Sequence, residues 1–360
     1  MSHPRPHISG LPPAIHGSID YREIDALGIS PDTVIDFSIN CNPYGPPPEV
    51  EKSIGEIHIE RYPDTDSTEL IRVLSEMLNI PAEQIIIGSG TTELIRLIAL
   101  AYFNSGDPVL IPQPTYSEYE TSCRIINAQV INQPSADLQD MRMSTGKIID
   151  AIREHRPTGI FLCNPNNPTG QYFSKSECIE IMSVSGDSLL VLDEAYIAFT
   201  ENIWSSPDLI GQGNLIILRS MTKDFALAGL RIGYAISDVH TIDVLKCIKP
   251  PWNINSVAQK AAVLALNSPN YIKECTLKIN EAKDHLIKEL TGLGFPVIPT
   301  QTNFFLVKTG NAAELRRNLL KKKILIRDCT SFGLPEYIRI APRTLDECRL
   351  LITAIKDCVA

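Results

Sequence analysis

Short apolar runs alternate with amphipathic stretches between about residue 80 and residue 244, and this alternation constrains the fold more than any other feature. The apolar runs are QIIIGSG, PVLIPQP, GIFLCNPNNPTG, SLLVLDEAY and NLIILRS, and stretches such as TTELIRLIALAYF carry apolar residues at helical spacing. Short buried strands joined by helices are typical of a mostly parallel α/β sheet. Ligands bind such sheets at the carboxyl ends of the strands, so we expect the functional site there.

The pattern breaks at KPPWNIN, residues 249–255. A long helical stretch over about residues 256–293 is followed by NFFLVK, the basic helix AELRRNLLKKK, ILIRDC, YIRIAP and a terminal helix. These elements predict a second, smaller α+β domain. We therefore expect a large domain over residues 36–250, a small domain over residues 251–360, and an N-terminal segment, residues 1–35, that packs with the small domain.

Charge and cysteine content argue against several classes of protein. The net charge of −9 at pH 7 argues against nucleic acid as the main partner, because phosphate backbones are bound by clustered Lys and Arg. No run approaches the ~20 apolar residues of a membrane span, and the N-terminus has no apolar secretory core. The nine cysteines form no CxxC pair, and no His/Cys cluster has zinc spacing. We expect a cytoplasmic protein with reduced thiols and no metal site.

The stretch GSGTTE, residues 88–93, follows a predicted strand and opens a predicted helix. Glycine at residue 90 lets the backbone approach a ligand, and the free N–H groups at a helix start attract an anion such as phosphate. The alternative is an ordinary β-to-α turn with Thr91 as the helix cap. The stretch is neither a P-loop nor a complete G-x-G-x-x-G, because residue 93 is glutamate.

Two further strand ends carry polar side chains. LLVLDEAY places Asp193 at the end of a buried strand, where an unpaired carboxylate is costly. Its partner could be a helix start, an arginine, or a protonated nitrogen on a bound cofactor. CNPNNPTG, residues 163–170, is rich in turn-forming residues, and its amides and hydroxyls could also bind a ligand oxygen at the carboxyl edge of the sheet.

A lysine follows the last of these runs. Lys223 lies between Ser220 and Arg231, and apolar residues 225–228 follow it after Asp224. Desolvation by such neighbours would disfavour the charged form of the amine and make Lys223 a candidate nucleophile. The alternative is a lysine that extends its ammonium group into solvent.

Taken together, the four strand ends supply a phosphate cradle, an amide, a carboxylate and an amine. Pyridoxal phosphate requires this set, because its aldehyde needs a lysine and its protonated ring nitrogen needs a carboxylate. The phenolic oxygen of the cofactor needs donors, for which Asn167 and Tyr196 are placed. Tyr116 in QPTYSEY is suited to stacking on the ring.

With NNPTG, DEAY and SMTKDFALAGLRIGY in this order and spacing, the chain resembles the fold-type I pyridoxal-phosphate enzymes of the class I/II aminotransferase superfamily over nearly its whole length. The resemblance implies a mostly parallel, seven-stranded-type sheet flanked by helices, a smaller α+β domain, and a covalent link from Lys223 to the cofactor. It also implies that Asp193 partners the ring nitrogen. The remaining cofactor contacts that it implies are Gly90, Thr91, Ser220 and Arg231 to the phosphate, and Asn167 and Tyr196 to the phenolic oxygen.

RYPD looks like the segment in which a tyrosine of this family, here Tyr62, reaches the cofactor of the neighbouring subunit. The resemblance therefore implies a homodimer with shared sites.

Two members of the superfamily compete for the closest resemblance. The stretches HGS, LGISPDTVIDFSINCNPYGPP, ERYPDTDS, PPWNINSVA and ILIRDC…YIRIAPR look more like the threonine-phosphate decarboxylase of cobalamin synthesis. The expected reaction is thus decarboxylation of L-threonine O-3-phosphate to aminopropanol phosphate. The first alternative is a histidinol-phosphate or related amino-acid aminotransferase that uses 2-oxoglutarate. The second is a non-enzymatic protein with the same fold.

Both candidate reactions take a small phosphorylated amino acid or amino alcohol. By the resemblance, His16, Gly17 and Asn40 line the substrate site, and Arg327 and Arg339 hold its anionic groups. Arginine binds phosphate or carboxylate in a bidentate manner, which agrees with that role. Without the resemblance, a surface ion pair with Asp328 would be the favoured interpretation of Arg327.

Overall fold

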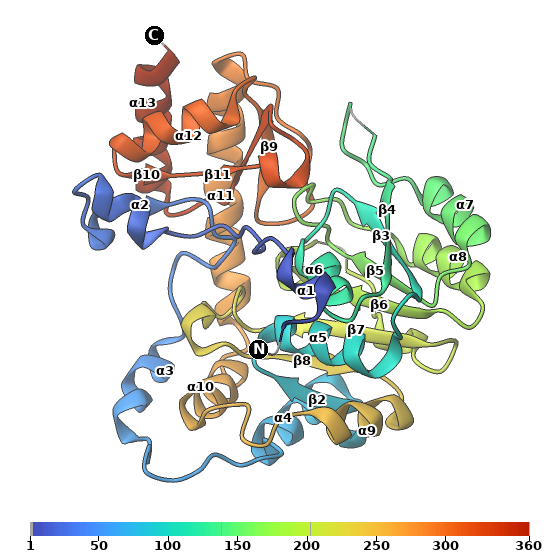
Figure 1. The fold of residues 1–360 in the computed structure, drawn as a ribbon. Coiled ribbons are helices and arrows are strands. Elements are labelled where there is room, and N and C mark those ends of the chain that lie inside the picture. The colour runs from blue at the N-terminus through green and yellow to red at the C-terminus, as the bar shows by residue number, and fades with distance from the viewer. Residues whose placement is uncertain (1–2, 138, 202, 360) are drawn as a thin grey trace.

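The computed structural model describes residues 3–137, 139–201 and 203–359, and a seven-stranded sheet forms its centre (Figure 1). In spatial order the strands are β2 (Ile85–Gly88), β8 (Gly233–Ile236), β7 (Leu215–Ser220), β6 (Leu189–Asp193), β5 (Gly159–Cys163), β3 (Pro108–Gln113) and β4 (Gln129–Pro134). All neighbours run parallel except β8, which is antiparallel to both β2 and β7. The prediction of a mostly parallel α/β sheet is confirmed.

Helices cover both faces of this sheet, which explains why its central strands are apolar throughout. Along β6, Leu190 and Leu192 pack into the cluster on one face, whereas Leu189 and Val191 pack into the cluster on the other. The first face is covered by α3 (Pro48–Ser53), α4 (Thr68–Leu78), α7 (Thr145–His155), α8 (Lys175–Ser185) and α10 (Ser256–Leu266). The second is covered by α5 (Gly90–Tyr102), α6 (Glu118–Ile125) and α9 (Val239–Ile248).

The register of the parallel strands brings their polar ends to one edge. Cys163 at the end of β5 lies opposite Asp193 at the end of β6, and Asp193 lies opposite Leu218 near the end of β7. Helix α5 starts directly after β2, which runs in the same direction as β7. The loops that carry the candidate cofactor residues therefore meet at the carboxyl edge, as expected for this fold.

A second, three-stranded antiparallel sheet has the order β11-β12-β9, with β11 (Arg327–Asp328), β12 (Tyr337–Ile340) and β9 (Phe305–Lys308). It packs with helices α11 (Tyr271–Gly292), α12 (Ala312–Lys321) and α13 (Leu345–Val359) around its own apolar cluster. The register places Arg327 directly opposite Arg339. Like charges in opposing positions repel each other, so this pair calls for an explanation from function.

The N-terminal segment contacts elements that lie beside each of the two sheets. Strand β1 (Ile35–Asp36) pairs with β10 (Ile324–Leu325), and Ile24 in α2 (Tyr21–Ala26) packs on Leu320 and Leu325. The short helix α1 (Pro6–Ser9) lies instead beside α6, where His7 Nε2 is 3.2 Å from the Ile125 carbonyl oxygen (Figure 1). The division into a segment and two domains, with its boundaries, stays a prediction.

The stretch over residues 256–293 forms two helices rather than one. Helix α10 ends at Leu266 and α11 begins at Tyr271. Pro269 lies between them, and proline has no backbone N–H and disfavours helical geometry at the residue before it. Within the residues that the structure describes, no helix combines the length and the apolar character needed to cross a membrane.

Candidate active site

Two adjoining cavities, of about 80 Å³ and about 310 Å³, lie at the carboxyl edge of the large sheet. Both are lined by Thr92, Tyr116, Asn167, Tyr196, Lys223 and Arg231. The smaller cavity adds the predicted residues Thr91, Asp193 and Ser220, and the larger adds His16, Gly17, Asn40, Arg327 and Arg339. Among the predicted residues, only Gly90 and Tyr62 do not line either cavity. The structure therefore brings residues from distant parts of the chain to one place.

Lys223 follows β7 and its side chain is half-buried at the boundary of the two cavities. Its Nζ lies 3.9 Å from the Sγ of Cys41. The apolar surroundings expected from the sequence are not those of the amine, because Phe225 and Leu227 pack into the hydrophobic core instead. Lys223 shares its cavity with polar side chains, Asp193 among them, and this setting corrects the interpretation drawn from its sequence neighbours.

Asp193 is 2% exposed, and burial raises its pKa to about 6. Its carboxylate accepts hydrogen bonds from the Tyr119 hydroxyl at 2.8 Å and from the Ala195 N–H at 3.0 Å. Neither partner carries a positive charge. Among the described residues no arginine bonds Asp193, so the arginine partner considered from the sequence is not found. A protonated ring nitrogen in the smaller cavity would offset the buried charge.

A second part of the smaller cavity can hold a phosphate group. Gly90 begins α5 with φ +72°, and the side chain of Ser89 does not cap this helix. A Cβ on Gly90 would lie 2.7 Å from Arg231 Nη2, so the absence of a side chain is what lets the guanidinium approach the helix start. The hydroxyls of Ser220 and Thr222, which are 2.7 Å apart, line the same cavity as Arg231. Free N–H groups, a cation and hydroxyls are the partners of a phosphate dianion.

Three side chains, those of Tyr116, Tyr196 and Asn167, flank the space between Asp193 and the candidate phosphate site. The Tyr116 hydroxyl lies 3.4 Å from Thr92 Oγ1, and burial raises the pKa of Tyr116 to about 12. Tyr196 is buried, and this burial raises its pKa as well. Asn167 is 5% exposed and its Oδ1 accepts a hydrogen bond from Arg339. An aromatic ring with one phenolic oxygen matches this combination of an aromatic face and polar groups.

Arg327 and Arg339 face the larger cavity and are 8% and 4% exposed. They donate to carbonyl oxygens and neutral side chains, with Arg339 bonded to the Ser38 carbonyl oxygen at 2.7 Å. Arg327 forms no ion pair with Asp328, which instead accepts from the Thr330 N–H and hydroxyl. Burial, together with the charge of Arg339, lowers the pKa of Arg327 to about 10. Two buried guanidinium groups with no carboxylate partner among the described residues favour an anionic ligand in this cavity.

The N-terminal segment closes the larger cavity. Arg327 donates to the carbonyl oxygens of Ile15 and His16, each at 2.9 Å. A Cβ on Gly17 would lie 2.5 Å from the Ser38 carbonyl oxygen, so a larger residue does not fit there. Both polar atoms of the Asn40 side chain are buried without a hydrogen-bond partner among the described residues, which is expected of a side chain that binds a ligand.

The sequence interpretation missed two residues of QPTYSEY. Glu118 is 4% exposed, lines the larger cavity, and accepts from His16 Nε2 at 2.9 Å. This hydrogen bond lowers the pKa of Glu118, and Arg96 lies on its other oxygen at 3.4 Å. Tyr119 was also missed, although it bonds Asp193. Their position at the start of a helix that follows a strand was a usable signal, because such positions face the carboxyl edge.

Tyr62 lies outside both cavities. Its side chain is 79% exposed and stacks on Trp252 with ring centroids 4.5 Å apart. Its predicted contact with the cofactor of a neighbouring subunit stays a prediction. Among the described residues, no three His, Cys, Asp or Glu side chains are grouped as metal ligands would be.

We predict that Asp193→Asn stabilises the cofactor-free protein at pH 8 but not at pH 4. Folded Asp193 keeps its proton up to pH about 6, whereas an unfolded aspartate loses it near pH about 3.9. The ionised carboxyl therefore destabilises the folded protein increasingly from about pH 4 to about pH 6, by up to roughly 3 kcal/mol above that range. Denaturant unfolding across this pH range measures the effect, and equal stability changes at both ends of the range would contradict it.

We predict that Gly90→Ala raises the dissociation constant of pyridoxal phosphate at least about tenfold, because the new methyl group displaces Arg231 from the helix start. Gly106→Ala is the matched control, since Gly106 also has φ > 0, at +89°, but has open space around it. Both variants bear the backbone cost of about 1–2 kcal/mol. Cofactor titration followed by absorbance separates them, and equal losses of affinity would rule out the phosphate site.

Comparison with known proteins identifies the family. The family model for aminotransferases of class I and II matches residues 32–355. A histidinol-phosphate aminotransferase of Methanocaldococcus jannaschii is 32% identical over 98% of this chain and 96% of its own length. The structure of the Sinorhizobium meliloti histidinol-phosphate aminotransferase with pyridoxal-5'-phosphate has a TM-score of 0.88 and 25% identity, covering 99% of both chains. An L-threonine-O-3-phosphate decarboxylase from Porphyromonas gingivalis has a TM-score of 0.76 and 29% identity, covering 90% of this chain and 98% of its own.

The expectation of threonine-phosphate decarboxylation is wrong. Relatives at 31–36% identity are histidinol-phosphate aminotransferases, and the decarboxylase is a more distant structural neighbour. Parts of two of the misleading stretches bond residues beside the predicted cofactor contacts. In NPYGPP, Asn42 donates to the carbonyl oxygen of Asp224, next to Lys223, and in PPWNIN, Asn253 bonds Glu93 at the start of α5. The relatives are enzymes, which also removes the non-enzymatic alternative. The chain belongs to the class I and II aminotransferases, a family of pyridoxal-phosphate-dependent enzymes.

Proposed function

We propose that this enzyme is a histidinol-phosphate aminotransferase, which transfers the amino group of histidinol phosphate to 2-oxoglutarate. The observation that carries the proposal is the charge pattern of the larger cavity. Two buried guanidinium groups, Arg327 and Arg339, face it together with one buried carboxylate, Glu118. Histidinol phosphate has a phosphate group for the arginines and an imidazole ring with an N–H for the carboxylate. The names of the relatives point to the same substrate.

The residues of the smaller cavity are proposed to hold the cofactor. Lys223 would bond its aldehyde, Asp193 its ring nitrogen, and Tyr116 would lie on the face of its ring. The remaining contacts are Gly90, Thr91, Ser220 and Arg231 to the phosphate, and Asn167 and Tyr196 to the phenolic oxygen. When bound, pyridoxal phosphate withdraws electrons from the substrate Cα and so acidifies the C–H bond there.

The side chains of this enzyme then move and hold protons. With the cofactor bound, the Lys223 amine would accept the proton from the substrate Cα. Asp193 would hold a proton on the ring nitrogen, since its hydrogen-bond donors Tyr119 and Ala195 are neutral and the nearby charge of Lys223 offsets its own charge only in part. The buried position of Asp193 strengthens this charge–charge contact, because water does not screen it.

One anion site can serve both half-reactions. Histidinol phosphate presents a phosphate and glutamate presents carboxylates, and guanidinium groups bind either anion with two parallel hydrogen bonds. The unpartnered Nε atoms of Arg327 and Arg339 give each group a spare donor. Asn40, whose amide is also unpartnered, would bind the substrate beside them.

A homodimer with shared sites belongs to the same proposal. Tyr62 is 79% exposed and stacks on Trp252, which is 46% exposed. Exposed aromatic side chains of this kind are typical of an interface core. The nine cysteines are all unpaired, which supports the cytoplasm as its compartment.

We predict that the purified enzyme converts histidinol phosphate and 2-oxoglutarate to the corresponding ketone and glutamate, and releases no carbon dioxide from L-threonine phosphate. Lys223→Ala should lose the visible absorbance of the bound cofactor, and its rate should fall on the order of 10³-fold or more, because the proton acceptor is removed. A coupled glutamate assay measures the first result. An enzyme that is active with other amino acids and inert toward histidinol phosphate would overturn the substrate assignment.

We predict that Arg327→Gln lowers kcat/KM for histidinol phosphate by roughly 30–150-fold, since about 2–3 kcal/mol is lost with a charged hydrogen bond. The same variant should change kcat/KM for histidinol, which has no phosphate, far less. Arg317→Gln on the exposed side of α12 is the control. Equal losses with both substrates would show that Arg327 only fastens the N-terminal segment through Ile15 and His16.

A further inference from the structure

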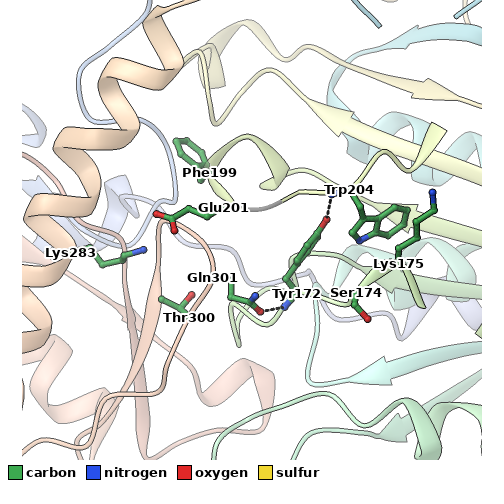
Figure 2. Close-up of a pocket in the computed structure, with 9 residues that line it drawn as sticks. All are labelled: Tyr172, Ser174, Lys175, Phe199, Glu201, Trp204, Lys283, Thr300 and Gln301. Carbon is green, nitrogen blue, oxygen red and sulfur yellow. Dashed lines mark hydrogen bonds between the residues drawn. The ribbon is translucent and has the colours of Figure 1, made fainter. Parts of the chain in front are cut away.

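A third cavity, of about 410 Å³, lies apart from the cofactor site and shares no lining residue with it (Figure 2). Its walls come from the loop between β5 and α8, with Tyr172, from the segment after β6, with Glu201 and Trp204, from α11, with Lys283, and from Gln301 before β9. It thus lies where segments of the large sheet meet segments of the C-terminal part. Its volume is that of a small-molecule site.

One end of the third cavity carries two opposite charges. Figure 2 shows the ammonium group of Lys283 and the carboxylate of Glu201 directed toward the same space. Each has a neutral partner, since Lys283 Nζ donates to the Thr302 carbonyl oxygen at 3.2 Å and Glu201 accepts from Asn280 Nδ2 at 3.2 Å. Burial lowers the pKa of Lys283, and the charges of Asp284 and Glu201 oppose this shift. A ligand with both charges would satisfy both groups.

The other end of the third cavity carries the rings of Tyr172 and Trp204, with Lys175 beside them, and the Lys175 Nζ lies 3.7 Å from Asp208 Oδ2. Trp204 Nε1 donates to the Phe173 carbonyl oxygen at 3.0 Å, and the Trp204 N–H donates to the Tyr172 hydroxyl at 3.3 Å. The backbone N–H of Tyr172 in turn donates to Gln301 Oε1 at 3.2 Å. These bonds fix both rings before any ligand binds, which lowers the entropic cost of packing a third ring against them.

We propose that the third cavity binds a free α-amino acid with an aromatic side chain, as an effector distinct from the substrate. Its carboxylate faces Lys283, its ammonium group faces Glu201, and its ring packs against Tyr172 and Trp204. A simple carboxylic acid would meet repulsion from Glu201, and a simple amine would meet repulsion from Lys283. An amino-acid zwitterion carries both charges, so it can pair with Lys283 and with Glu201 at the same time.

Two short segments, residues 167–172 and residues 299–304, connect this cavity to the substrate site. They are held together by Gln171 Nε2, which donates to the Pro299 carbonyl oxygen at 2.8 Å, and by the Gln301 N–H, which donates to the Gly170 carbonyl oxygen at 3.1 Å. Asn167, which bonds Arg339, lies a few residues before Gly170, and Phe304, whose ring lies 5.5 Å from the Arg339 guanidinium, lies a few residues after Gln301.

A ligand that bridges the two segments therefore acts on both neighbours of Arg339. We expect it to change KM for the anionic substrate more than kcat. The proposal that a ligand binds in the third cavity depends only on the residues of that cavity. The expected effect on KM depends in addition on the proposed function.

The test is equilibrium dialysis of the holoenzyme with L-phenylalanine, with the cofactor absorbance recorded in the same samples. Lys283→Met and Glu201→Gln should each raise the dissociation constant at least about tenfold. Lys288→Met, on the exposed side of the same helix, should leave it unchanged. An unaltered cofactor spectrum in each variant shows that the protein is folded and loaded, and binding is read without any turnover.

Four results would overturn the proposal. These are no binding by wild type up to about 1 mM, an equal dissociation constant for Lys283→Met and wild type, saturation that coincides with a change in the cofactor spectrum, and equally tight binding of 3-phenylpropionate. Binding that passes these checks but leaves KM unchanged in the working enzyme would refute the effector role.

Discussion

The guanidinium group of Arg339 joins three separate parts of the chain, and the geometry of the candidate active site depends on it. Arg339 lies on β12 and donates to Asn167 in the loop after β5 and to the Ser38 carbonyl oxygen after β1. Its planar group also lies over the ring of Phe304. A buried guanidinium is stable only where its N–H groups find acceptors, yet its Nε has none among the described residues. An anionic ligand completes the set and so tightens the contacts between all three segments.

The buried charges of the site cost stability when no ligand balances them. Burial raises the pKa of Asp193 and lowers that of Arg327, so in both cases the folded protein disfavours the charged form. Under the proposed function, a cofactor with a protonated ring nitrogen would reverse the first effect, and a substrate with a phosphate group would reverse the second. Local violations of burial rules at functional sites are expected for this reason.

Much of the fold and the cofactor site could be predicted from the sequence, because both follow from local patterns. The apolar runs predict parallel strands, and parallel strands bring Asp193, Asn167 and Lys223 to one edge whatever the details of packing. What surrounds each side chain could not be predicted this way. Lys223 is followed by apolar residues that turn into the core, and Tyr119 reaches Asp193 from a helix 74 positions earlier in the chain. The position of Tyr119 at a strand-to-helix junction indicates the carboxyl edge, but which side chain it bonds there depends on the three-dimensional arrangement.

The choice between decarboxylation and amino transfer illustrates the same limit at the level of chemistry. The reaction depends on which bond at the substrate Cα stands perpendicular to the cofactor ring, and the cofactor residues are common to both reactions. The orientation must therefore come from groups that grip the distal ends of the substrate. Glu118, Arg327 and Arg339 line the same cavity and carry charges of opposite sign. Under the proposed function, a substrate with an imidazole ring at one end and a phosphate at the other would be bound at both ends, whereas threonine phosphate has two anions and would place one of them near Glu118.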